Sequence, residues 1–265
     1  MRIILTGASM GIGEAAARAL AAPGVRLALV ARTRDKLEKS VESVKAGGGE
    51  AFAVVADLSR PEEAARVVPE SLEKLGGVDV LINNAGVGIA NTFAAMKMED
   101  MRHLMEVNLF SVTRLMQDVI PPMRAQGGGH IINISSVVSK ISLPTAGSYS
   151  ASKFALNGIS DAALVELAGD KIKVTTLCPG VVSSNFHTNL LGGARKPAGP
   201  SGWTPDQVAA AIVRAVKNPP RERTLGAANK ALVGLSRVSP GFVNWLLGKL
   251  YDRRIRPALT RDADG

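Results

Sequence analysis

The stretch RIILTGASMGIG, residues 2–13 of a 265-residue chain, decides the fold. A short, mostly aliphatic run ends at Thr6 and passes directly into a glycine-rich loop, and the alanine-rich segment 12–21 that follows predicts a helix. Glycines permit the tight turns that bring a backbone close to a pyrophosphate, and a helix N-terminus presents free N–H groups and the positive end of a dipole to it. The segment therefore predicts a nucleotide site on a strand–loop–helix unit.

Strand-like and helix-like segments alternate through most of the chain. The predicted strands are rich in Val, Ile, Leu and Ala without polar alternation, which is typical of central strands in a parallel sheet covered on both faces. They span residues 2–6, 25–30, 51–56, 78–82, 130–135 and 171–177. The predicted helices span residues 12–21, 34–46, 61–75, 99–125, 149–168 and 205–217. The alternation predicts the α/β class, with a doubly wound parallel sheet in a single Rossmann domain over residues 1–265.

Two segments depart from this pattern. Residues 183–203 have no clear period and are predicted to form a long loop over the substrate. Residues 228–251 are predicted as one or two helices, interrupted at 239–241, within a basic C-terminal extension, 228–265. Residues 195–265 carry +8 (13 Lys/Arg against 5 Asp/Glu) of the net charge of +9. We expect this extension to pack against the protein or a second subunit, and the alternative is peripheral contact with an anionic membrane.

Composition argues against several other classes of protein. Cys178 is the only cysteine, so no disulfide can form within the chain. No apolar run reaches the roughly 18–20 residues of a spanning helix, and no signal peptide is apparent, so a cytoplasmic location is expected. His103, His130 and His187 lack ligand spacing, and no metal site is expected. Aromatic residues are 4% of the chain and no nucleic-acid module is recognisable, so no nucleic-acid partner is expected.

Six motifs or single residues of interest follow one another between residues 6 and 184. They are TGxxxGxG at 6–13, Asn83-Asn84-Ala85-Gly86 after the fourth strand, Asn108, Ser136, Tyr149-x-x-x-Lys153 and Pro179-Gly180. The series resembles the short-chain dehydrogenase/reductase family, and it covers about two thirds of the chain. The spacing of the glycines differs from the GxGxxG of the common dinucleotide fingerprint. The resemblance implies an oxidoreductase that uses a nicotinamide cofactor.

The resemblance implies four catalytic residues. Tyr149 would be the general acid/base, and Lys153, four residues later on the same helix face, would favour its phenolate form. Ser136 would polarise the substrate carbonyl. The adjacent Ser135 has the same chemistry, and only the family's thirteen-residue offset to Tyr149 selects Ser136. Asn108 would hold a water in a proton relay through Lys153.

The end of the second predicted strand bears on the choice of cofactor. An acidic residue there would bind both ribose hydroxyls and repel a 2′-phosphate, but the chain has Arg32, whose guanidinium suits a phosphate. We therefore expect NADP(H) rather than NAD(H). By resemblance, Asp57 and Leu58 would meet the adenine, Asn83 and Ala85 the ribose side, and Val182 and Ser184 the carboxamide. The full set of expected cofactor contacts is Gly7, Ser9, Met10, Gly11, Ile12, Gly13, Arg32, Asp57, Leu58, Asn83, Ala85, Gly86, Tyr149, Lys153, Pro179, Gly180, Val182 and Ser184.

These features predict hydride transfer between NADP(H) and a carbonyl or secondary alcohol, with Tyr149 moving the proton. Apolar side chains in residues 183–203 favour an apolar small-molecule substrate. Two alternatives keep the same fold: a non-catalytic NADP(H)-binding sensor, which should lack Tyr149 or Lys153, and a membrane-associated scaffold that uses the basic extension. By resemblance, the helices at 99–125 and 149–168 would form the interface of a homodimer or homotetramer.

Overall fold

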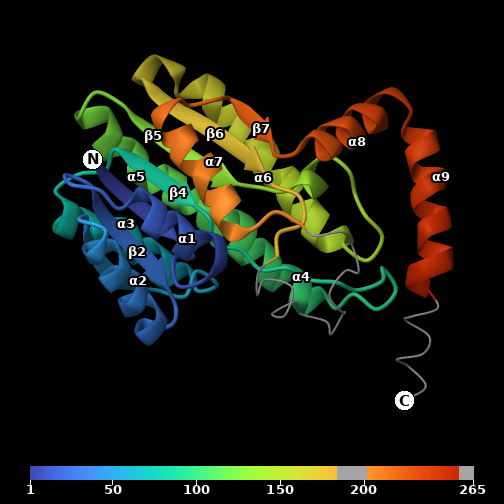
Figure 1. Cartoon of the computed structure of the whole chain (residues 1–265), viewed down its shortest axis with the longest axis horizontal. Helices are drawn as coiled ribbons and strands as arrows, with labels where there is room; N and C mark the ends of the chain where they lie inside the picture. The colour runs from blue at the N-terminus through green and yellow to red at the C-terminus, as the bar shows by residue number, and fades with distance from the viewer. Residues whose placement is uncertain (184–201, 257–265) are drawn as a thin grey trace.

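The computed structural model of the chain describes residues 1–183 and 202–256, and its centre is a parallel sheet (Figure 1). Within these residues the sheet has seven strands in the order β3-β2-β1-β4-β5-β6-β7, and every adjacent pair is parallel. The strands are β1 (Arg2–Thr6), β2 (Arg26–Ala31), β3 (Glu50–Val55), β4 (Val80–Asn83), β5 (Gly129–Ile134), β6 (Ile172–Cys178) and β7 (Glu222–Thr224). The order reverses between β1 and β4, so the crevice for a ligand is expected at their carboxyl ends.

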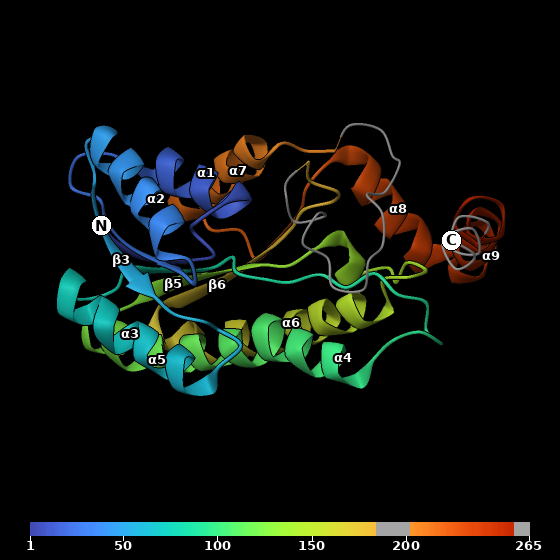
Figure 2. The same ribbon diagram turned by 90° about the horizontal axis from the view of Figure 1, so that it is seen from below.

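Helices cover both faces of the sheet (Figure 2). One layer contains α1 (Gly11–Leu20), α2 (Arg34–Ala46) and α7 (Pro205–Lys217), and the opposite layer contains α3 (Pro61–Leu75), α5 (Ser111–Ala125) and α6 (Gly147–Glu166). Each layer packs on its own buried aliphatic cluster from the strands, since successive strand residues point to opposite faces. The predicted doubly wound parallel sheet is confirmed.

The helix predicted over 99–125 is interrupted in its middle. It consists of α4 (Met98–Met105), a π-helical turn η1 (Glu106–Phe110), and α5. π-turns within helices often occur at functional positions, and this one contains Asn108, whose side chain is fully buried. The sequence predicted one helix over this range, because hydrophobic spacing does not reveal a single wider turn within a helix.

Strand β7 was not predicted. Its three residues, Glu-Arg-Thr, are too short and too polar to show strand alternation. Pairing with β6 defines it, supported by a 3.0 Å hydrogen bond from Thr176 N to Arg221 O beside the strand. The six predicted strands are all present, with their ends shifted by one or two residues where they differ.

The predicted break in the C-terminal segment is confirmed. Helix α8 (Ala227–Val238) ends before Ser239, and α9 (Pro240–Leu250) begins at a proline and continues into a π-turn, η5 (Tyr251–Ile255). In both views α9 lies at the end of the molecule, beyond α8 (Figures 1 and 2). Among the described residues no helix combines the length and apolar character needed to cross a bilayer.

Candidate functional site

A polar clip joins the carboxyl ends of β1 and β4. The Thr6 hydroxyl accepts hydrogen bonds from the backbone N–H groups of Asn84 and Ala85, both at 3.0 Å. The Asn84 amide in turn donates to the carbonyls of Thr6, at 3.0 Å, and Gly7, at 3.2 Å. The clip fixes the start of the glycine loop against the NNAG segment. Asn84 and Thr6 both belong to motifs recognised in the sequence, but no function was predicted for either side chain.

The glycine loop has the geometry of an anion cradle. Gly7 and Gly11 have φ values of 66° and 58°, a region that favours glycine. A Cβ on Gly13 would collide with the carbonyl oxygen of Gly7, so the first turn of α1 packs directly on the loop. These features fit a pyrophosphate bound by the backbone N–H groups at the start of α1, where the sequence places Ser9 and Ile12.

Arg32 and Asp57 lie together beyond the ends of β2 and β3. Arg32 is exposed, and its charge acts on the Asp57 carboxyl. Burial raises the pKa of Asp57, but hydrogen bonds from Ser59 and the positive charges of Arg32 and Arg60 outweigh burial and hold that pKa below its usual value. Leu58 is buried beside them. Arg32 is therefore on the rim of the crevice with its guanidinium accessible to solvent.

Asn83 points into the core beneath the sheet. Its Nδ2 donates to Asn133 Oδ1 at 2.9 Å, and Asn133 Nδ2 donates to Ser160 Oγ of α6 at 2.8 Å. The Oδ1 of Asn83 is buried without a hydrogen-bond partner. A contact from Asn83 to a cofactor would therefore come from its backbone. Gly86, three residues later, brings the chain to Asn108 and Lys153, since a Cβ there would lie 3.2 Å from Asn108 Oδ1 and 3.7 Å from Lys153 Nζ.

The buried Asn108 amide makes hydrogen bonds to Val87 and Ser152. Its Oδ1 accepts from Val87 N and its Nδ2 donates to Val87 O, both at 2.9 Å. The same Nδ2 donates to Ser152 Oγ at 3.1 Å, and Ser152 Oγ donates to Tyr149 O at 2.8 Å. The side chain thus ties the segment after β4 to the helix that contains Tyr149. This arrangement gives Asn108 a positioning function, and its Oδ1 can accept one further hydrogen bond. The water predicted for Asn108 stays a prediction.

Ser136, Tyr149 and Lys153 come together where β5 ends against α6. Lys153 Nζ lies 5.9 Å from the centroid of the Tyr149 ring and donates to Ile134 O at 2.9 Å. Burial raises the pKa of Tyr149 to about 12, although hydrogen bonding with Ser136 lowers it and part of the residue reaches solvent. Burial also lowers the pKa of Lys153 to about 8. At neutral pH the protein without its cofactor therefore holds a neutral phenol beside an ammonium group.

A second buried network distinguishes the two adjacent serines. Ser135 Oγ donates to Asn157 Oδ1 at 2.7 Å, and Asn157 Nδ2 donates to Ser139 Oγ at 2.9 Å. Ser139 Oγ donates to the Ser136 carbonyl at 2.6 Å. Ser135 is therefore committed to Asn157, whereas Ser136 faces Tyr149. Asn157 was not among the predicted site residues, although it continues the four-residue spacing of Tyr149 and Lys153 on one face of α6.

The segment after β6 closes the site on the side of α8. Pro179 O accepts from Val137 N at 2.9 Å, which ties this segment to the residue after Ser136. A Cβ on Gly180 would collide with the side chain of Asn229. Val182 pairs with Trp203 in an isolated parallel bridge, which brings both ends of the predicted substrate loop together. The predicted contact Ser184, and the loop from 184 to 201, lie outside the described residues.

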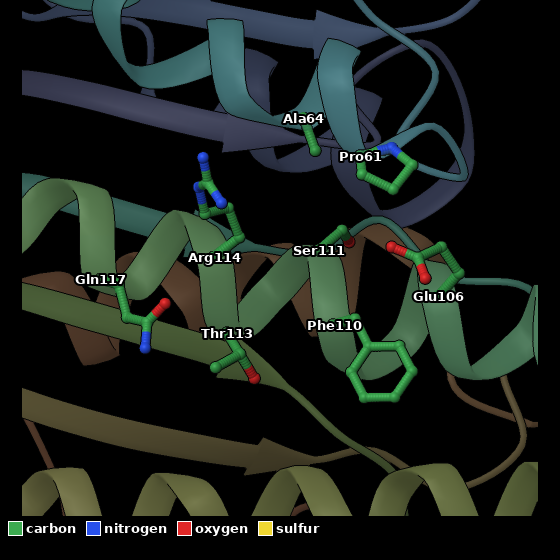
Figure 3. Close-up of a pocket in the computed structure, with 8 residues that line it drawn as sticks. All are labelled: Pro61, Ala64, Glu106, Phe110, Ser111, Thr113, Arg114 and Gln117. Carbon is green, nitrogen blue, oxygen red and sulfur yellow. The ribbon is translucent and has the colours of Figure 1, made fainter.

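Two surface depressions lie away from these groups. One of about 240 Å³ is formed where the start of α3 approaches η1 and α5 (Figure 3). Pro61 and Ala64 line one wall, and Phe110 and Arg114 are among the residues of the other. None of the predicted catalytic or cofactor-binding residues lines it. In the part of the chain that the structure describes, no three His, Cys, Asp or Glu side chains are grouped as metal ligands.

Comparison with known proteins agrees with this architecture. The family model described as short chain dehydrogenase matches residues 1–193. The ketoacyl reductase HetN of Nostoc sp. is 34% identical over 249 residues, covering 91% of this chain and 86% of the relative. An alcohol dehydrogenase from the archaeon Thermococcus sibiricus, complexed with 5-hydroxy-NADP, is 32% identical with a TM-score of 0.75 over 85% of this chain and 96% of that chain.

A third similar protein was solved with the other nicotinamide cofactor. It is a short chain dehydrogenase/reductase from Burkholderia phymatum in complex with NAD, 25% identical with a TM-score of 0.81 over 91% of this chain and 94% of that chain. The parallel sheet covered by helices agrees with the overall fold similarity to this structure. The chain therefore belongs to the short-chain dehydrogenase/reductase family of oxidoreductases.

Proposed function

We propose that the protein transfers a hydride between NADP(H) and a carbonyl or secondary alcohol, with Tyr149 as the general acid/base. One observation carries the proposal: the side chains of Ser136, Tyr149 and Lys153 lie close together. They lie on the same side of the sheet as the polar clip of Thr6 and Asn84 that holds the glycine loop. The bound nicotinamide would supply or accept the hydride. The protein contributes the position of the substrate, the polarisation of its oxygen and the movement of one proton.

Three side chains contribute to the chemistry at the substrate oxygen, each in a different way. The Ser136 hydroxyl donates a hydrogen bond to the carbonyl oxygen and stabilises the negative charge that grows there. Tyr149 gives its phenolic proton to that oxygen as the carbonyl carbon receives the hydride, so the carbonyl becomes an alcohol. A phenol whose pKa is raised to about 12 is fully protonated at neutral pH, which suits the reductive direction. Lys153 stabilises the phenolate left behind while its ammonium stays protonated.

The preference for NADP(H) rests on Arg32. No acidic side chain stands at the end of β2, and the exposed guanidinium of Arg32 can bind a 2′-phosphate with two hydrogen bonds. The complex of the Thermococcus sibiricus relative with 5-hydroxy-NADP supports this choice, whereas the Burkholderia phymatum relative was solved with NAD.

The test compares kcat/KM for NADPH and NADH in wild type and in Arg32→Asp. Wild type should prefer NADPH. The variant should lose roughly 10- to 100-fold with NADPH, because it replaces a charge-assisted pair with repulsion. Arg34→Asp, at an exposed position paired with Glu38 on α2, is the matched control and should leave the preference unchanged. A wild-type preference for NADH would contradict the proposal.

We propose an apolar or medium-sized carbonyl compound as the substrate. The similarity to a ketoacyl reductase and to an alcohol dehydrogenase supports a C=O or CH–OH group as the reacting centre. Consumption of NADPH across ketones, aldehydes, acyl thioesters and steroids identifies the class. No turnover of any member, with cofactor binding intact, would favour the alternative of a non-catalytic sensor, which the presence of both Tyr149 and Lys153 argues against.

We also propose that the outward faces of η1–α5 and α6 join two or four copies of the chain. Phe110 on η1 is 54% exposed, and Phe154 and Val165 on α6 are exposed as well. Large apolar side chains on a helix surface are typical of a subunit interface. The molar mass in solution, by light scattering, should be two or four times 27.7 kDa.

A further inference from the structure

The described residues of the C-terminal helix α9 are apolar on two opposite sides. On the inner side Val243 is buried and joins Val233 of α8 and Ile141 in a small cluster, with Leu247 packed against it. Ile141 belongs to the segment that follows Ser136, so α8 and α9 are anchored beside the catalytic groups. The outer side, defined by Phe242, Trp245 and Lys249 at helical spacing, faces away from this cluster. Arg253 follows in the π-turn η5 and is exposed.

Aromatic side chains dominate the first half of this outer face of α9. Phe242 is 49% exposed and Trp245 is 58% exposed, and their rings stack with centroids 5.9 Å apart. Lys249 Nζ lies 5.6 Å from the centroid of the Trp245 ring, one turn further along. Val238, at the end of α8, is 87% exposed. Aromatic rings in this setting, next to basic side chains, are typical of helices that lie in a membrane interface.

The charge of this region identifies the kind of partner. Residues 227–256 contain six basic residues and only one acidic residue, Asp252. The basic side chains are Lys230, Arg237, Lys249, Arg253, Arg254 and Arg256. Two copies of this region, each with six basic residues and one acidic residue, would repel each other if these faces met. An anionic surface has the complementary charge.

We infer that the outer face of α9 binds the surface of an anionic lipid bilayer, with Phe242 and Trp245 in the interface and Lys249 and Arg253 at the headgroups. The helix would lie parallel to the surface, because no described helix can cross a bilayer. The anchoring of α9 beside Ile141 places the catalytic end of the sheet near that surface. An apolar substrate of the proposed function would then reach the site from the bilayer.

Binding is measured on the full-length protein with extruded vesicles. The chain has two tryptophans, so Trp203→Phe leaves Trp245 as the only indole reporter. Its emission should shift to shorter wavelength with vesicles of phosphatidylcholine and phosphatidylglycerol, and much less with phosphatidylcholine alone. Co-sedimentation should fall as salt rises, because salt screens the headgroup attraction.

Matched variants separate the two contributions to binding. Phe242→Ser/Trp245→Ser should weaken co-sedimentation by about tenfold or more, because both rings lose their apolar contact with lipid. Lys249→Glu/Arg253→Glu should weaken it by at least about fivefold per charge. Lys39→Glu on α2 reverses an equally exposed positive charge away from α9 and should bind as wild type does.

Three results would overturn the inference: no binding of wild type to anionic vesicles at low salt, equal binding by the aromatic variant, or loss of oligomeric mass in that variant without any vesicle binding. The last result would assign the face to a second copy. Vesicle binding is read without cofactor or substrate, so its failure leaves the proposed reaction standing. Conversely, loss of the proposed reaction would leave vesicle binding intact. Turnover of a water-soluble substrate should be the same in the aromatic variant, the charge variant and Lys39→Glu.

Discussion

Replacement of Lys153 by methionine tests how the site makes a tyrosine reactive. The substitution keeps the length of the side chain and removes its charge. Lys153 Nζ lies 5.9 Å from the centroid of the Tyr149 ring. At this separation and an effective dielectric constant of about 20, an ammonium stabilises a phenolate by about 3 kcal/mol. That energy corresponds to about a hundredfold change in the ionisation constant of the phenol.

Burial sets the conditions under which this charge acts. The pKa of Tyr149 is raised to about 12 and that of Lys153 is lowered to about 8 in the protein without cofactor. Without cofactor the ammonium would lose its proton before the phenol does. The positive charge of bound NADP+ would favour the phenolate, so Tyr149 would ionise while Lys153 is still charged. The simple expectation that a fixed cation favours phenolate holds only while Lys153 stays protonated, which the hydrogen bond to Ile134 O supports.

The assay is the pH dependence of kcat for alcohol oxidation at saturating NADP+, where Tyr149 must first lose its proton. The rising limb of kcat against pH should lie at higher pH in Lys153→Met than in wild type. The size of the shift should correspond to a hundredfold lower ionisation constant of Tyr149. Lys153→Arg, which keeps the charge, is the control. Since the chain has only two tyrosines, a Tyr251→Phe background also lets tyrosinate absorbance report on Tyr149 alone. Rising limbs at the same pH in wild type and Lys153→Met would refute the electrostatic reasoning.

Two further predictions concern the buried polar groups. Burial, and to a lesser extent the charge of Lys173, lowers the pKa of His130 to about 4 in the folded protein. Because the unfolded chain binds this proton at higher pH, the free energy of unfolding should fall as the pH falls from about 6.5 to about 4. In His130→Gln, urea unfolding should show a loss of unfolding free energy that is smaller by up to about 3 kcal/mol over this pH range. Parallel curves of unfolding free energy against pH in wild type and variant would contradict this prediction. Asn157→Leu should lower kcat about tenfold with little change in KM for NADPH, because it releases Ser135 and Ser139 behind Ser136. An unchanged kcat would show that this network does not position the serine.

Features that depend on local chemistry were predictable from the sequence. The glycines at 7, 11 and 13 predicted the loop, and the structure supplies the reason in two positive φ angles and a close approach. The apolar strands and the break before Pro240 also follow from local composition and turn chemistry. The NNAG segment was placed correctly after β4, next to the loop.

Features that depend on contacts between distant segments were not predictable. The clip of Thr6 and Asn84 joins residues 78 positions apart, and the Ser135–Asn157 bond joins residues 22 apart. The π-turn at Asn108 is an insertion of one residue that the apolar pattern does not record. The pKa values of Tyr149 and Lys153 depend on burial, which the four-residue spacing on a helix cannot reveal. Strand β7 is defined by its partner β6 and not by its own sequence.

Turnover by Tyr149→Phe tests the central claim most directly. Phenylalanine keeps the ring that packs against Lys153 and removes only the hydroxyl, so the variant should fold and bind NADPH as wild type does. With the substrate found in the screen, kcat should fall by about a thousandfold, within the range for loss of a general acid. A kcat within a few-fold of wild type, with cofactor binding intact, would show that the proton comes from another group and would contradict the account.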